Sequence, residues 1–294
     1  MRDAKIEITE SLIDFESKGE SESVRIARLA REKTLNSLLL ETIDSLYIKI
    51  NAWAQDDSVK CIILDSSSSR AFCAGADVVK LQREILQSEG NNRDYADAFF
   101  SHEYRLDYLI HVIKKPIICW GSGIVMGGGL GLLSGCSHRV GTVSTKLAMP
   151  EINIGLFPDA GGTKFLADVP DHLGLFMGLT GCHLNPSDGL AFGLLDIIVE
   201  ESQKEEIFYS VCNIEWAGDN LENIDKVSSV IKEFEAEVGD LGGLLNHRFE
   251  IANLIKKCLG GEDFLKEFEK RLPSLSLDDW MSVARDNFFV GSPI

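Results

Sequence analysis

The feature that constrains this chain most is the alternation of short apolar segments with longer segments of helical periodicity. Residues 60–65 (KCIILD) and 116–120 (PIICW) are short and mostly apolar, as expected for strands buried on both faces. Residues 39–56 and 95–113 instead carry apolar side chains every three or four positions, which is the spacing of one helix face. The order of these segments predicts an α/β protein.

Two more strands are predicted near the start of the chain, at 6–13 and 23–30, where apolar and polar residues alternate. A polar, glycine-containing turn is expected between them at 16–22. Residues 66–77 begin with four consecutive serines and are predicted to form a loop.

The last third of the chain differs from the rest in composition and in hydrophobic periodicity. Glycines become sparse after about residue 200, and periodic stretches at 227–238 and 264–271 predict helices. We therefore divide the chain into an α/β core at 1–202 and a C-terminal helical segment at 203–294.

Charge and cysteine usage exclude several classes of protein. The 294 residues include 46 Asp and Glu against 29 Lys and Arg, for a net charge of −17, which disfavours a nucleic-acid binder. The longest apolar stretch, 116–133, is interrupted by glycines and is no membrane span. The seven cysteines form no CxxC pair and fit free thiols in a reducing compartment. The N-terminus lacks a secretory or transit pattern. We expect a cytoplasmic protein without nucleic-acid or membrane partners.

Common nucleotide, hydrolase and metal motifs are absent from the sequence. Neither GxGxxG, GxxxxGK[ST] nor the GxSxG elbow occurs, and the six histidines show no HxxxH or HExxH spacing. The expectation is therefore no metal and no cofactor.

Two glycine-rich turns are candidates for binding a negatively charged oxygen. One, Ala74–Ala76, follows a predicted strand, and the other, Gly127–Gly129, opens a predicted helix. Small residues let a substrate approach the backbone, and two converging N–H groups make an oxyanion hole. The alternative is that these glycines only permit close helix packing.

Two carboxyl groups are candidates for acid–base chemistry. Glu151 and Asp159 lie eight residues apart in the apolar segment 148–162, whose prolines and glycines force turns between them. An acid among apolar side chains has a raised pKa and can serve as a general base. The alternative is a pair of solvated loop acids.

Three blocks of this sequence resemble the signature segments of the crotonase, or enoyl-CoA hydratase/isomerase, superfamily. They are RAFCAGAD (70–77), GIVMGGGLGL (123–132) and MPEINIGLFPDAGG (149–162). The resemblance implies a spiral of ββα units followed by helices, and an acyl-coenzyme A thioester as substrate. It implies backbone N–H groups of Ala76 and Gly128 as oxyanion donors. The coenzyme A site would be lined by Cys73, Ala74, Gly75 and Ala76.

Within that superfamily the chain is most similar to the 3-hydroxyisobutyryl-CoA hydrolases. Hydratases use two glutamates, and Glu151 matches the second, but Gly131 stands at the position of the first. The resemblance to the hydrolases implies hydrolysis of 3-hydroxyisobutyryl-CoA, a step of valine catabolism, with Glu151 and Asp159 catalytic. The substrate site carried over from those hydrolases is Glu103, Gly128, Glu151 and Asp159.

Two other functions remain open from the sequence. One is an enoyl-CoA isomerase or hydratase that uses Glu151 alone, and the other is an acyl-CoA-binding protein of this fold without catalysis. The superfamily resemblance implies a homo-oligomer, a trimer or a trimer-based assembly. The final residues, 290–294, resemble the start of a segment from which the family continues into further helices, so we expect a truncated C-terminal segment.

Overall fold

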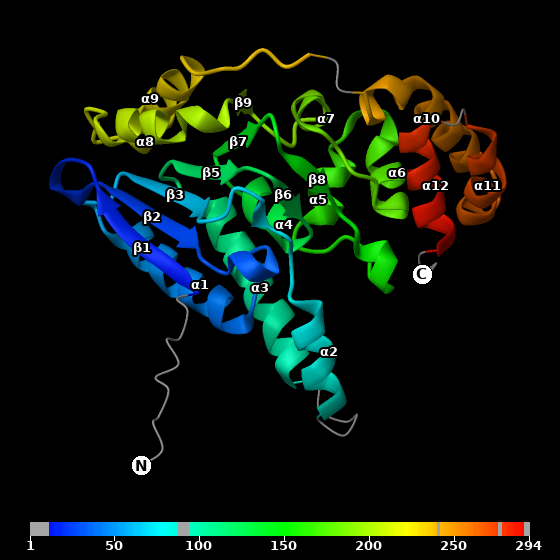
Figure 1. Ribbon diagram of the computed structural model, residues 1–294, viewed down its shortest axis with the longest axis horizontal. Helices are drawn as coiled ribbons and strands as arrows, with labels where there is room; N and C mark the ends of the chain where they lie inside the picture. The colour runs from blue at the N-terminus through cyan, green and yellow to red at the C-terminus, as the bar shows by residue number, and fades with distance from the viewer. Residues whose placement is uncertain (1–11, 88–93, 240–241, 276–277, 291–294) are drawn as a thin grey trace.

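A computed structural model describes residues 12–87, 94–239, 242–275 and 278–290 of the chain (Figure 1). Nine strands form two sheets within these residues, of six and three strands, in the orders β1-β2-β3-β5-β7-β9 and β4-β6-β8. The strands are β1 (Ile13–Lys18), β2 (Val24–Leu29), β3 (Cys61–Ser66), β4 (Ala71–Cys73), β5 (Ile117–Gly121), β6 (Ile124–Met126), β7 (His138–Thr142), β8 (Lys146–Ala148) and β9 (Ile197–Val199).

Successive strand pairs build a spiral. Each of the pairs β3–β4, β5–β6 and β7–β8 places its first strand in the large sheet and its second in the small one. All pairings are parallel except that of β1 with β2. The predicted α/β class and spiral of ββα units are therefore confirmed.

Helices cover both faces of the large sheet, which explains its apolar strands. In β3, Cys61 and Ile63 belong to one core and Ile62 and Leu64 to another, because successive side chains point to opposite faces. Figure 1 shows α8 and α9 on one side of this sheet and α1 and α3 on the other. The helices are α1 (Leu40–Gln55), α2 (Val78–Gln87), α3 (Asp94–Val112), α4 (Gly128–Ser134), α5 (Gly162–Ala167), α6 (Leu173–Thr180), α7 (Pro186–Ala191), α8 (Lys204–Cys212), α9 (Asn220–Lys232), α10 (Leu244–Leu259), α11 (Phe264–Arg271) and α12 (Asp279–Val290).

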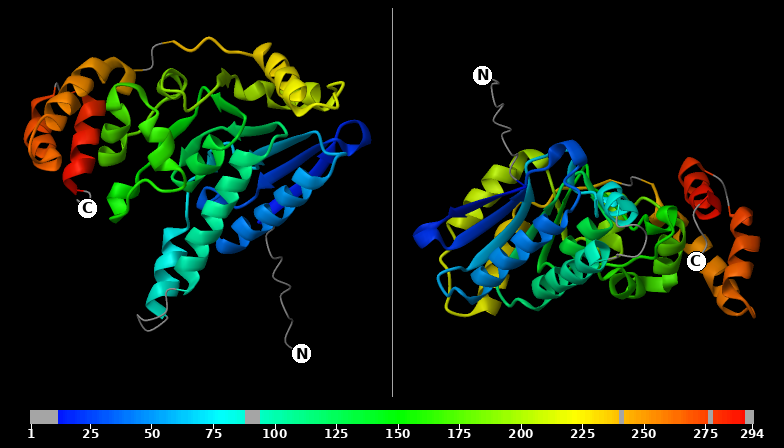
Figure 2. Two further views of the ribbon diagram at one scale, coloured as in Figure 1. Left: turned by 180° about the vertical axis from the view of Figure 1, so that it is seen from behind. Right: turned by 90° about the horizontal axis from the view of Figure 1, so that it is seen from below.

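The helical periodicity predicts α1, α3 and α11 well. In α1 the predicted apolar face is buried: Ile43, Leu46, Ile50 and Trp53 all pack in the core. The C-terminal part is helical as expected, and α10, α11 and α12 gather beside α6 at one end of the molecule (Figure 2).

The N-terminal prediction is partly wrong. Residues 6–11 of the predicted first strand lie outside the described residues, and β1 runs through the first part of the predicted 16–22 turn. Strand β1 continues to Lys18 because Phe15 packs edge-on against Trp53, with ring centroids 5.7 Å apart, and Glu16 pairs with Arg28 of β2. The reversal occurs only at Gly19–Ser23.

Two other predictions also need correction. The 66–77 loop contains the short strand β4, whose partners lie on β6, about fifty residues later in the sequence. The helix predicted at 227–238 is instead α9, which Asp219 caps by accepting a hydrogen bond from the Leu221 N–H. It ends at Lys232 because the following residues turn back to β9, where the Ala236 N–H donates to the Ile198 carbonyl at 2.8 Å.

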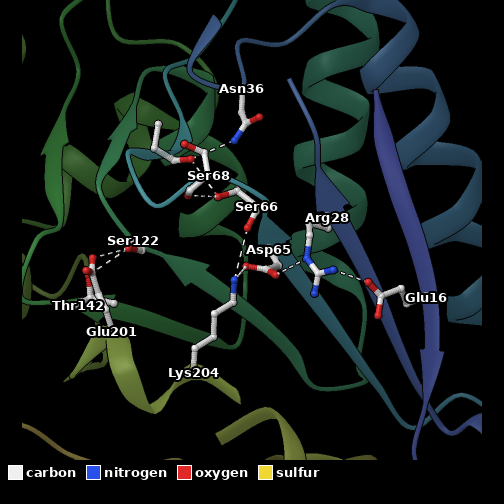
Figure 3. A network of polar contacts seen from close by, with 11 residues as sticks. Glu16, Arg28, Asn36, Asp65, Ser66, Ser68, Ser122, Thr142, Glu201 and Lys204 are labelled. Atoms are coloured by element: carbon white, nitrogen blue, oxygen red, sulfur yellow. Dashed lines mark hydrogen bonds and ion pairs between the residues drawn. The ribbon is translucent and has the colours of Figure 1, made fainter. Parts of the chain in front are cut away.

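A polar network joins the ends of the parallel strands to the start of the C-terminal helices (Figure 3). The fully buried Asp65 of β3 pairs with Lys204 Nζ at 2.6 Å and with Arg28 Nε at 2.8 Å. Nearby, Glu201 accepts hydrogen bonds from Ser122 at 2.6 Å and Thr142 at 3.0 Å. These contacts fix the position where the chain leaves the sheet.

Replacing Lys204 by methionine should lower the free energy of unfolding by about 1–3 kcal/mol, because Asp65 would keep only one of its two cationic partners in a buried position. The measurement is urea unfolding. The matched control is Lys232→Met, which removes an exposed i,i+3 ion pair and should change stability by less than about 0.5 kcal/mol. Equal losses in the two variants would show that the buried pair adds nothing.

All seven cysteines are free, six of them buried. Among the described residues, no helix is both long and apolar enough to cross a membrane.

Candidate active site

The two predicted glycine turns lie against each other. Gly75 and Gly127 both have positive φ angles, +89° and +52°, which L side chains rarely adopt. A Cβ on Gly75 would lie 3.0 Å from the carbonyl oxygen of Met126 and 3.3 Å from the nitrogen of Gly128. The glycines thus allow the loop after β4 and the start of α4 to come into backbone contact.

The two predicted oxyanion donors make no hydrogen bond to the backbone of the described residues. No hydrogen bond from the N–H of Ala76 or of Gly128 occurs within the described part of the chain. Neighbouring backbone groups hold the loop in place: the Leu38 N–H donates to the Gly75 carbonyl at 2.8 Å, and the Ala74 N–H donates to Leu35 at 3.0 Å. Two free N–H groups on adjoining turns can stabilise a developing oxyanion.

Glu151 begins the short 3₁₀ helix η3 (Glu151–Ile154) and is 7% exposed. The alternative of a solvated acid is therefore wrong for this residue. Its Oε1 lies beside Gly127, only 2.9 Å from the position that a Cβ on Gly127 would take. Its Oε2 is buried and makes no hydrogen bond to any described residue. Burial raises the pKa of Glu151 to about 7, with a smaller contribution from Asp159.

Asp159 is half-buried in the turn before α5. The Tyr104 hydroxyl of α3 donates a hydrogen bond to its Oδ2 at 2.8 Å. Burial raises the pKa of Asp159, and the Tyr104 hydrogen bond opposes this rise. The charge of Asp159 also raises the pKa of Glu151.

Glu103, expected only from the family resemblance, joins the same site from α3. Its side chain is 2% exposed, and a Cβ on Gly128 would overlap its Oε1. Burial raises its pKa well above the usual range, and Asp107, Asp159 and Glu151 raise it further. The structure therefore brings the two glycine turns together with Glu151 and Glu103. Cys73 ends β4, and Ala74, Gly75 and Ala76 follow it in the first of these turns.

Two site residues, Tyr104 and Asp107, were not assigned roles from the sequence. Asp107 follows Glu103 by one helical turn, so the two share a face of α3. The i,i+4 spacing of these two acids is the signal for Asp107 in the sequence. Tyr104 lies in the segment that resembles the hydrolases, but its partner Asp159 is 55 residues away in sequence, so spacing does not predict their hydrogen bond.

The chemistry of the site is that of carboxyl groups and backbone N–H donors. No group of three or more His, Cys, Asp or Glu side chains in the described residues is arranged to hold a metal ion. The site combines an anion-stabilising pair of N–H groups with a carboxyl whose pKa is near neutral, which suits acyl transfer through a negatively charged intermediate.

A large apolar cavity adjoins this site. It has a volume of about 770 Å³ and is lined by residues of η3, α5, α6, α11 and α12. Ile152, Leu156 and Pro158, which lie between the two acids in sequence, contribute to its wall, whereas Glu151 and Asp159 do not.

Comparison with known proteins identifies the relatives of this chain. Residues 24–294 match a family described as enoyl-CoA hydratase/isomerase. Among solved structures, an enoyl-CoA hydratase from Rhodobacter sphaeroides superimposes with a TM-score of 0.79 at 26% identity, over 96% of this chain and 75% of its own.

Curated relatives include two named hydrolases. The chain is 40% identical over 195 residues to 3-hydroxyisobutyryl-CoA hydrolase 1 of Arabidopsis thaliana, covering 66% of this chain and 50% of the plant protein. It is 40% identical over 182 residues to the mitochondrial 3-hydroxyisobutyryl-CoA hydrolase of Gallus gallus, covering 62% of this chain and 46% of the chicken protein. The chain thus spans about half the length of these relatives.

Proposed function

Because the chain belongs to the enoyl-CoA hydratase/isomerase family, we propose that it hydrolyses the thioester of 3-hydroxyisobutyryl-CoA, releasing 3-hydroxyisobutyrate and coenzyme A. The observation that carries the proposal is the position of the buried Glu151 carboxyl beside the N–H groups of Ala76 and Gly128, which have no hydrogen-bond partner among the described residues. Relatives named as hydrolases of this thioester support the choice of substrate.

In the proposed reaction the thioester carbonyl oxygen binds between the N–H groups of Ala76 and Gly128. Attack on the carbonyl carbon then places negative charge on that oxygen, where both N–H groups stabilise it. The C–S bond breaks and the coenzyme A thiolate leaves. Glu151 either attacks the carbon itself, forming an anhydride that water then hydrolyses, or removes a proton from the attacking water.

The remaining acids orient the acyl group. Asp159, held by the Tyr104 hydroxyl, would accept a hydrogen bond from the 3-hydroxyl group of the substrate. Glu103 contributes a second buried carboxyl with one unpartnered oxygen among the described residues. The backbone of Cys73–Ala76 would line the coenzyme A site, and the reaction needs no cofactor and no metal.

The absence of an acid at position 131 favours hydrolysis over hydration. Gly131 occupies the place of the first hydratase glutamate, and its α carbon faces Ala160, whose Cβ and carbonyl oxygen are each 2.7 Å from the position of an added Cβ. A side chain at 131 has no room unless the turn carrying Asp159 moves. Two-acid hydration of the kind inferred for hydratases is thus blocked at this position.

The experiment is a thiol-release assay on 3-hydroxyisobutyryl-CoA and crotonyl-CoA with the same preparation. Thiol release from the hydroxyacyl substrate alone is the expected result. Conversion of crotonyl-CoA without thiol release would favour the isomerase or single-acid hydratase. Coenzyme A binding without turnover of either thioester would favour a binding protein.

We also propose a cytoplasmic location and a trimer or trimer-based assembly. The chicken relative is named as mitochondrial, so cell fractionation is the test of location. Sedimentation of the purified chain tests the assembly.

A further inference from the structure

Helices α3 and α4 pack against each other at the site, with two acids of α3 facing two glycines of α4. Glu103 and Asp107 lie one turn apart on α3, and Gly128 and Gly131 lie about one turn apart on α4. A Cβ on Gly128 would overlap Oε1 of Glu103, and a Cβ on Gly131 would lie 3.4 Å from Oδ2 of Asp107. The two glycines therefore leave space between the helices that two carboxyl groups fill.

Asp107 is the less expected of the two carboxyl groups. Both of its oxygens are buried, and neither makes a hydrogen bond to a described residue. Gly131 links it to the Asp159 turn, because the same missing Cβ would contact Ala160 as well as Asp107. Asp107 and Ala160, the residue after the proposed hydroxyl-binding acid, thus both border the space beside Gly131.

Within the described part of the chain, no cation contributes to the pKa of Asp107. Segment α4 (GGLGLLS) contains no titratable group. Among described residues, the charged group that acts on the pKa of Asp107 is Asp159. Asp107 in turn raises the pKa values of three other groups, Glu103 and Tyr104 on its own helix and Cys73 on β4.

Building on the hydrolase function proposed above, we propose that Asp107 is a positioning residue that acts only while protonated. Its neutral carboxyl supports the Asp159 turn against α4. Loss of the proton places a second buried negative charge behind that turn, repels Asp159 and withdraws it from the substrate.

The electrostatics place this transition within an accessible pH range. Burial, and next the charge of Asp159, raise the pKa of Asp107 to about 8. With this pKa, about a tenth of the enzyme has a protonated Asp107 at pH 9. The ionisation of Asp107 should therefore lower kcat/KM roughly tenfold between pH 7 and 9. The fall should appear mainly in KM, because Asp159 binds the substrate hydroxyl.

The test measures thiol release from 3-hydroxyisobutyryl-CoA at pH 7.5 to 9.5 for wild type, Asp107→Asn and Asp97→Asn. Each rate is corrected for non-enzymatic hydrolysis and divided by the rate of the same protein at pH 7.5. Asparagine has the shape of aspartic acid and cannot ionise. Asp97 is an exposed aspartate of the same helix and serves as the matched control. We expect the alkaline fall in wild type and Asp97→Asn, and a flat profile in Asp107→Asn. A fall of equal size in Asp107→Asn overturns the inference and leaves the hydrolase function intact.

A second readout does not depend on turnover. Because the pKa of Asp107 is raised in the folded state, the unfolded chain releases this proton first, and the stability contributed by the neutral form is lost as pH rises toward 8. The thermal midpoint of wild type should therefore drop relative to that of Asp107→Asn between pH 5 and 8. In an active enzyme, parallel midpoint curves would overturn the inference about Asp107, and diverging curves would support it. If no thiol is released at all, the proposed function fails and the positioning role of Asp107 fails with it.

Discussion

Replacing Glu151 by glutamine should reduce thiol release from 3-hydroxyisobutyryl-CoA by about 10²–10⁴-fold, because the amide can neither attack the carbonyl nor take a proton from water. The two side chains have nearly the same shape, so KM and the unfolding midpoint should change little. Steady-state kinetics of the purified variant, with unfolding followed by circular dichroism, provide the measurement.

The control is Glu206→Gln, which neutralises an exposed glutamate at the start of α8 and should leave the rate unchanged.

Wild-type activity should also decline as pH falls below about 7, since only ionised Glu151 is active and its pKa is raised to about 7. If Glu151→Gln kept the wild-type rate, Glu151 would have no part in the mechanism, whether or not activity declined below pH 7.

The covalent and general-base routes for Glu151 differ in one intermediate. Quenching turnover with hydroxylamine converts an acyl–Glu151 anhydride into a hydroxamate on that side chain, which mass analysis of the peptide detects. A modified Glu151 would establish the nucleophilic route. An unmodified peptide from an enzyme sampled during rapid turnover would favour activation of water.

Replacing Gly129 by alanine should lower kcat by about 10²–10³-fold through loss of one oxyanion donor. The added Cβ would overlap the carbonyl oxygen of Cys73 and lie 2.8 Å from its Cβ, so α4 must move away from β4. That movement carries the Gly128 N–H away from Ala76. Overpacking of this kind also costs about 1–3 kcal/mol of stability, which urea unfolding measures in parallel with kcat.

The control for this variant is Gly218→Ala, at an exposed glycine with no heavy atom within 4 Å of an added Cβ. It should alter neither rate nor stability. If Gly129→Ala lost stability and kept a normal kcat, Gly129 would serve packing alone. The alternative of close helix packing would then be the better interpretation of the glycine run.

Much of the local structure could be predicted because it depends on local spacing. The apolar face of α1 and the bounds of α11 follow from a period of 3.6 residues, and the strand interiors from fully apolar runs. Predictions failed where a distant segment decided the outcome. Strand β1 extends to Lys18 because Phe15 packs against Trp53 of α1, and α9 ends at Lys232 because the following chain pairs with β9.

The sequence by itself determined the α/β class, the two glycine turns and the pair Glu151 and Asp159, because these depend on residue types and short spacings. Only the tertiary structure decided that Gly75 and Gly128 lie in backbone contact and that Tyr104 donates to Asp159. It also decided that both carboxyl oxygens of Asp107 are buried without a partner among the described residues. Periodicity shows which residues share a face of a helix. Which helix meets that face depends on contacts between residues far apart in sequence, and those contacts set the burial and the pKa values of the acids.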